Sequence, residues 1–108
     1  MTRKEQVERS SGNVFADLGV ANPEQYLAKA ELAAKIFKIV RRRRLSQAAA
    51  GKLLGINQPK VSALLHGRLD GFSTDRLLRF LTALGCDVRI TVSEPKPRAR
   101  GRIRVKAG

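Results

Sequence analysis

Apolar residues recur at every third or fourth position from Tyr26 onward, which is the spacing of an amphipathic helix. Asn22 and Pro23 open this segment; Asn is a favoured N-cap residue and Pro suits the first helical position. We therefore expect a helix over residues 23–43, with arginines in its last turn, where positive charge is favourable. The apolar stripe of this helix consists of Tyr26, Leu27, Ala30, Ala33, Ala34, Phe37 and Val40, and it is broadened by Leu32, Ile36 and Ile39.

Three shorter helices are predicted after it, each beginning behind a residue that can cap its first turn and ending at a glycine. The caps are Ser46, Asn57 and Ser73, and the predicted helices cover residues 47–54, 58–66 and 74–84. Phe72 and Leu77 flank the last start at the spacing of a hydrophobic staple. The pattern predicts an all-α domain of four to five helices.

Residues 47–64 have the features of a helix-turn-helix unit. Two helices that cross steeply need a small residue where their backbones approach, and Gly51 supplies it. The sharp turn between them needs a residue that tolerates positive φ, and Gly55 supplies that. The apolar residues expected to bury the shared seam are Leu54, Ile56, Val61 and Leu64.

Residues 86–92 differ from the rest because apolar and polar side chains alternate, as they do in a β-strand. Val88, Ile90 and Val92 would share one face. A lone strand leaves its backbone groups unpaired, so it needs a partner. The weakly alternating tail offers a hairpin within the chain, whereas a second copy would also supply the two-fold symmetry of DNA half-sites. We favour the second copy and expect one C-terminal β-strand used in dimerisation.

The chain divides into three parts on this interpretation. Residues 1–13 lack periodicity and are expected to form a flexible N-terminal arm, and residues 14–92 form the domain, starting with a short apolar patch. Residues 93–108 hold two Pro, two Gly and many basic residues, which predicts a basic flexible tail.

The charge of the chain narrows the class of partner. Twenty-two Lys and Arg against nine Asp and Glu give a formal net charge of +13, which favours binding to polyanions. Charge alone leaves a soluble basic surface and ribosome association open. Four Phe and one Tyr give little support to a stacking platform for single strands.

Composition also limits chemistry and location. Cys86 and His66 are the only soft metal ligands, too few for a zinc site, and no residue is placed to activate a nucleophile. We expect no enzyme activity, metal or cofactor. Without an apolar run of membrane length or a signal peptide, and with one cysteine, we expect a cytoplasmic protein without membrane contact.

The helix predicted at 58–66 carries the candidate base-reading residues Gln58, Pro59, Lys60 and Ala63 on its outward face. The first residues of such a helix meet base edges in the major groove. Gln58 suits an adenine edge, Lys60 suits guanine acceptors or a phosphate, and Pro59 suits a thymine methyl. An ordinary solvated helix face is the alternative.

Candidate phosphate contacts surround this helix. Gln47 and Asn57 stand at helix N-termini, which attract anions, although both can simply cap. Ser62 and Arg68 are further candidates. The run Arg41, Arg42, Arg43 and Arg44 suits the DNA backbone and, equally, a solvated helix end.

Residues 32–84 resemble the Cro and phage-repressor class of helix-turn-helix domains, the Xre family, which has the lambda-repressor-like fold. Gly51 departs from the Ala that is more usual in that family. The resemblance implies a sequence-specific regulator that reads a palindromic double-stranded DNA operator as a homodimer.

A narrower resemblance, to HigA-type antitoxins, covers about 80 residues. It is carried by residues 13–19, 23–32, 71–73 and 79–88, together with the helix-turn-helix. It implies an autorepressor of a toxin–antitoxin operon with a RelE-like toxin as partner. A stand-alone Xre-type regulator and an RNA- or ribosome-associated basic protein remain as alternatives.

Overall fold

The computed structural model describes residues 23–97 and 100–106 and places four α-helices in them. The helices are α2 (Pro23–Arg42), α3 (Gln47–Leu54), α4 (Gln58–Leu65) and α5 (Thr74–Ala83). The prediction of all four is confirmed; three end one residue earlier than expected. The predicted N-terminal arm, the apolar patch after it and Asn22 lie outside the described residues.

The three predicted N-caps are confirmed. The side chain of Ser46 accepts the N–H of Ala49 at 3.0 Å, and Asn57 Oδ1 accepts the N–H of Lys60 at 3.0 Å. Ser73 Oγ accepts the N–H of Arg76 at 3.1 Å. Each such bond satisfies an N–H that has no partner within its helix and stabilises the helix by about 1 kcal/mol.

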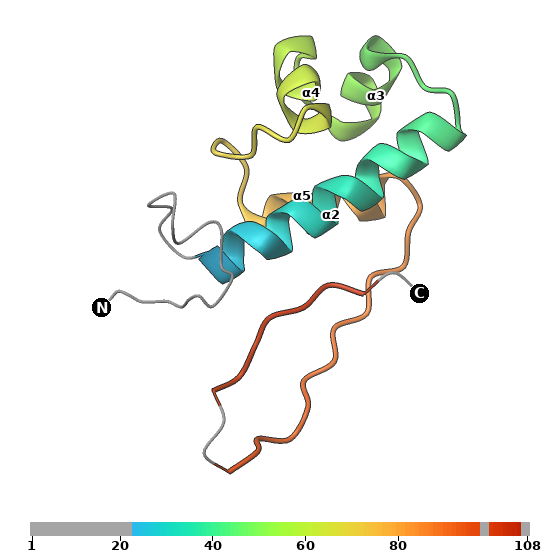
Figure 1. Ribbon diagram of the computed structural model, residues 1–108. Helices are drawn as coiled ribbons and strands as arrows, with labels where there is room; N and C mark the ends of the chain where they lie inside the picture. Colours follow the sequence, from blue (N-terminus) through green and yellow to red (C-terminus); the bar gives the residue numbers. More distant parts are fainter. Residues whose placement is uncertain (1–22, 98–99, 107–108) are drawn as a thin grey trace.

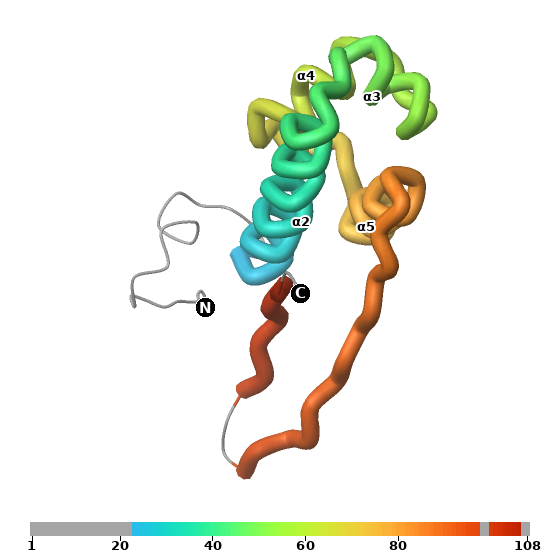
Figure 2. The backbone as a smooth tube through the Cα atoms, turned by 90° about the vertical axis from the view of Figure 1, so that its right-hand side faces the viewer, coloured from blue at the N-terminus to red at the C-terminus, as the bar shows by residue number. Residues whose placement is uncertain are grey.

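The long helix α2 lies against α5, while α4 packs on α2 and α3 packs on α4 and α5 (Figure 1). Figure 2 shows α2 and α5 side by side, with α3 and α4 together at one end. The largest fully buried side chains come from α2, α4, α5 and the loop between the last two: Ile36, Val61, Leu64, Leu69 and Leu77. No helix in the described ranges is long and apolar enough to cross a membrane.

The turn between α3 and α4 depends on two glycines. Gly55 has φ of 72°, in the left-handed region, and its N–H donates to the carbonyl of Gly51 at 2.8 Å. A Cβ on Gly51 would lie 2.7 Å from the carbonyl oxygen of Ile56 and 3.2 Å from Val61 Cγ2. Even the smallest side chain there would push α3 away from the turn, so close contact explains why this chain has glycine in place of the expected alanine.

The prediction of a C-terminal strand is wrong for the residues that the structure describes. Residues 86–92 are not part of any strand, and Val88, Ile90 and Val92 are exposed rather than packed on a sheet. The alternation of side chains is present, but the described residues supply no second strand to receive the backbone hydrogen bonds. The two legs of the C-terminal arm, residues 86–97 and 100–106, project away from α3 and α4 (Figures 1 and 2).

The second leg of this C-terminal arm returns to α2. The N–H of Val105 donates to Glu31 Oε1 at 3.3 Å, and the half-buried Val105 side chain packs against the core. Arg100 pairs with Glu24 at 4.0 Å, a contact between an exposed guanidinium and a partly buried carboxylate. The end of the arm therefore lies against the N-terminal half of α2, with one apolar and two polar contacts.

Candidate nucleic-acid interface

The candidate base-reading residues lie on the first turns of α4. Gln58, Pro59 and Lys60 are exposed and Ala63 is half-buried, while Val61 and Leu64 on the opposite side are fully buried. The cap from Asn57 fixes where the helix begins. The buried face therefore holds α4 in place and leaves Gln58 and Pro59 at its exposed N-terminal end.

The Lys60 side chain is turned towards the loop between α4 and α5. Its Nζ lies 5.8 Å from the centroid of the Phe72 ring, a cation–π contact. The ammonium group therefore lies near the loop that follows α4. Of the two roles that its position suggests, this arrangement suits the phosphate better than the base edge.

The predicted phosphate-binding residues are spread along both helices. Gln47 is half-buried as the first residue of α3, and Asn57 is exposed but uses Oδ1 for the cap. Ser62 lies in the second turn of α4, with its Oγ 3.4 Å from His66 Nδ1, and Arg68 is exposed after the end of α4. Gln47 and Asn57 are the two that stand at helix N-termini, as predicted.

The arginine run at the end of α2 is divided among different contacts. Arg43 Nη1 donates to the carbonyl of Leu84 at 3.0 Å, and this bond joins the C-terminal ends of α2 and α5. The Arg41 guanidinium lies 5.6 Å from the Phe37 ring centroid. Arg44 adopts a positive φ of 55° where the chain turns towards α3. All four arginines are exposed at the α2–α3 junction, and Arg43 is bonded to the end of α5.

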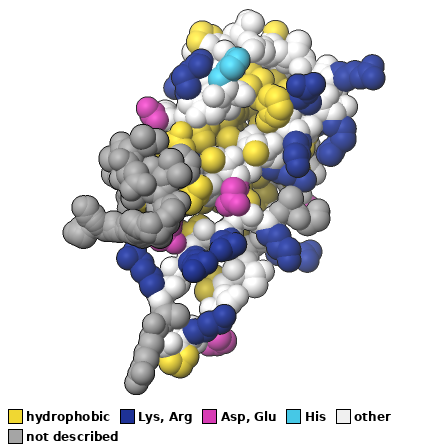
Figure 3. Space-filling model, in the orientation of Figure 1, with side chains coloured by type: hydrophobic (Ala, Val, Ile, Leu, Met, Phe, Trp, Pro, Cys, Tyr) yellow, Lys and Arg dark blue, Asp and Glu magenta, His cyan; other side chains and the backbone are white. Residues whose placement is uncertain are grey.

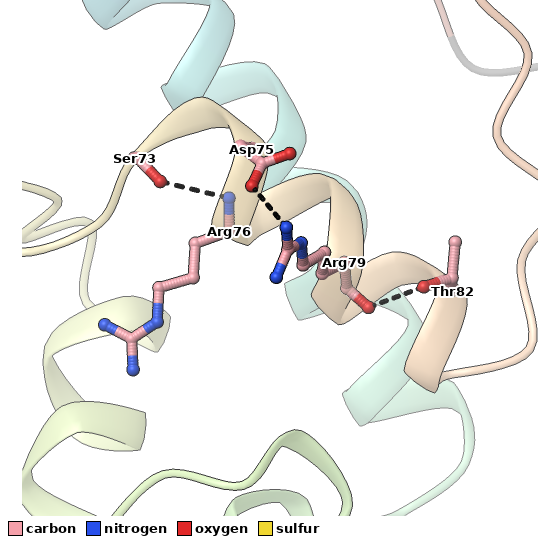
Figure 4. Close-up of polar contacts among 5 residues, drawn as sticks. All are labelled: Ser73, Asp75, Arg76, Arg79 and Thr82. Atoms are coloured by element: carbon pink, nitrogen blue, oxygen red, sulfur yellow. Dashed lines mark hydrogen bonds and ion pairs between the residues drawn. The ribbon is translucent and has the colours of Figure 1, made fainter.

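Arg76 is a basic residue that the sequence analysis missed. Its guanidinium carbon lies 5.6 Å from the Phe72 ring centroid and 5.7 Å from that of Phe80. The two rings meet edge to face at 5.9 Å. Figure 4 shows the Arg76 side chain pointing away from the neighbouring pair of Asp75 and Arg79. The spacing Phe72, Arg76, Phe80, at intervals of four, is the signal that could have identified it.

Basic side chains cover both ends of the molecule. Figure 3 shows Lys and Arg over the helical end and over the C-terminal arm, with few acidic groups between them. Ion pairs among the described residues join Arg79 to Asp75 at 3.2 Å and Arg100 to Glu24. Most Lys and Arg side chains in the described part of the chain therefore form no ion pair with a carboxylate there, as expected of a surface that binds polyanions.

Comparison with known proteins agrees with this geometry. A family model described as a helix-turn-helix domain matches residues 14–93. A solved structure described as "Putative XRE Family Transcriptional Regulator" is similar at 47% identity, with a TM-score of 0.75, over 82% of this chain and 100% of its own. No curated protein matches. The chain therefore belongs to the helix-turn-helix family of the XRE type.

Proposed function

We propose that this chain is a sequence-specific DNA-binding transcriptional regulator. The observation that carries the proposal is the exposed N-terminal turn of α4, with Gln58 and Pro59, on a pair of helices fixed by the Gly51 contact. The matching helix-turn-helix family and the similar XRE-type structure support it.

The mechanism follows from where these side chains lie. The N-terminal end of α4 enters the major groove, where Gln58 bonds an adenine edge and Pro59 and Ala63 contact apolar groups. Gln47 and Asn57 hold backbone phosphates near the N-termini of α3 and α4. The base contacts select the sequence and the phosphate contacts set the register of the helix.

Selection of preferred duplexes from a random library by the full chain tests the proposal, followed by affinity measurements on a selected and a random duplex. Gln58→Ala should reduce the preference for the selected duplex by about 5- to 150-fold per half-site, since one bidentate pair contributes about 1–3 kcal/mol. Gln25→Ala makes the same change at an exposed position at the start of α2 and should leave the preference intact. Full selectivity in the Gln58 variant would contradict the assignment of α4.

The regulator is further proposed to act as a homodimer on a palindromic operator. Val88, Ile90 and Val92 support this, because they are 37%, 73% and 90% exposed and an apolar partner surface would cover them. Sedimentation of the full chain tests it: the wild type should be a dimer, and Ile90→Lys a monomer. A wild-type monomer at operator-binding concentrations would contradict the homodimer.

The narrower function proposed is that of an antitoxin that represses its own operon. The HigA-like segments around the helix-turn-helix support this assignment, which would add a RelE-like toxin as partner. Co-expression with the product of the neighbouring gene should yield a stable complex and relieve growth arrest by that product. With no complex formed, the chain would be a stand-alone regulator.

A further inference from the structure

Two cationic side chains from different helices contact the same aromatic ring. Lys60 of α4 and Arg76 of α5 both lie over Phe72, at 5.8 Å and 5.6 Å from its centroid. Phe72 is 3% exposed and belongs to the core, so the ring is a fixed platform. Both positive charges are thus held against the same buried ring.

This pair of charges is not neutralised within the part of the chain that the structure describes. Asp70 lies in the same loop, yet it pairs with neither side chain, and Asp75 in the first turn of α5 pairs with Arg79 instead. A cationic side chain without a carboxylate partner is stabilised when it binds an anion. The arrangement is suited to an anionic ligand.

We propose that Lys60 and Arg76 each bind a backbone phosphate of duplex DNA, beside the base-reading turn of α4. This site rests on the proposed function. The Arg76 guanidinium carbon lies over both rings, and a guanidinium group can donate two parallel hydrogen bonds to phosphate oxygens. Lys60 adds a point charge from the helix that reads the bases, so the contact fixes the lateral position of α4 in the groove.

Of the two roles that suit Lys60, it takes the phosphate contact, and Arg76 adds a second contact from α5. Both contacts should strengthen binding to any duplex without choosing its sequence. This property separates them from Gln58, whose loss should affect the selected duplex alone. Salt dependence gives a second readout, because each phosphate contact releases counterions on binding.

Affinity of the full chain for a selected and a random 30-base-pair duplex, measured from 50 to 200 mM salt, tests the site. Arg76→Gln and Lys60→Gln should each weaken binding to both duplexes and lower the salt slope by about 0.9 per chain bound. With a slope change of that size, the ratio of wild-type to variant affinity should fall about 3.5-fold over this salt range. Arg76→Lys should keep the wild-type slope.

Arg79→Gln is the matched control, since it removes one positive charge from the same helix on the side that Figure 4 shows facing Asp75. It should leave the slope nearly unchanged. Equal slopes for the Arg76 and Arg79 variants, or a loss confined to the selected duplex in the Lys60 variant, would overturn the phosphate site. If Arg76→Gln fails to fold by circular dichroism, Lys60→Gln decides the question.

The two proposals fail in different ways in this experiment. Wild-type protein that binds no duplex contradicts the proposed function and the phosphate site together. Wild-type protein that selects a sequence, with an unchanged salt slope in the Arg76 and Lys60 variants, contradicts the phosphate site alone.

Discussion

The α3–α4 unit and the C-terminal arm use similar apolar residues in opposite ways. Val61 and Leu64 are 0% and 1% exposed in α4, whereas Ile90 and Val92 are 73% and 90% exposed in the arm. The helices satisfy most backbone hydrogen bonds within themselves and need a neighbour only for their apolar side. An extended segment needs a neighbour for its hydrogen bonds as well. The comparison shows that regular spacing of apolar residues leads to burial only where a partner is present.

The largest expected effect is the loss of stability when a buried side chain of α4 is shortened. Leu64→Ala should lower the free energy of unfolding by about 2–5 kcal/mol, because it removes a fully buried side chain and leaves a cavity. Ile90→Ala, in the arm, should change it by less than about 0.5 kcal/mol at concentrations where the chain is monomeric. Urea denaturation followed by circular dichroism measures both. Similar losses for the two variants would show that the arm is buried against something else.

A pair of glycine substitutions sharpens the contrast. Gly51→Ala should destabilise the fold by about 1–3 kcal/mol, since its Cβ would lie 2.7 Å from a backbone oxygen that cannot move freely. Gly101→Ala places the same methyl group in open space within the arm and should be neutral or slightly stabilising. Thermal unfolding of both variants provides the measurement. A stable Gly51→Ala protein would mean that α3 can shift away from the turn.

The smallest expected effect concerns the attachment of the arm to α2. Glu31→Gln weakens the acceptor for the Val105 N–H and should cost under about 0.5 kcal/mol of global stability, because the site is exposed. Hydrogen exchange at Val105 should nevertheless become faster. Glu24→Gln removes the longer pair with Arg100 and should leave that amide unchanged. Equal exchange rates in the two variants would mean that Glu31 is not the anchor.

Most of the helical part of the fold could be predicted from the sequence because its signals are local. A cap residue such as Ser46 acts on an N–H three positions away, and Gly55 ends a helix through its own backbone angle. The strand prediction failed because alternation at 86–92 specifies a face but not a partner. The return of the arm to α2 depends on Glu31, 74 positions from Val105, and no local pattern encodes such a contact.

The candidate site could be predicted only in part for the same reason. Gln58 and Pro59 follow directly from their positions at the start of α4. The contact of both Lys60 and Arg76 with Phe72 depends on how α4 and α5 pack, which only the folded chain reveals. In the sequence, Arg43 is one member of a basic run. Its bond to Leu84 depends on where α5 ends.

That bond from Arg43 has a consequence for the spacing of a bound operator. It joins the end of α2, which leads into α3, to Leu84, directly before the point where the arm leaves the domain. If two chains are joined by their arms, this bond would help to fix the separation of the two α4 helices and the angle between them. One inserted base pair rotates the second half-site by about 35°. Such a dimer would discriminate against operators with the wrong spacing between half-sites as well as against those with the wrong bases.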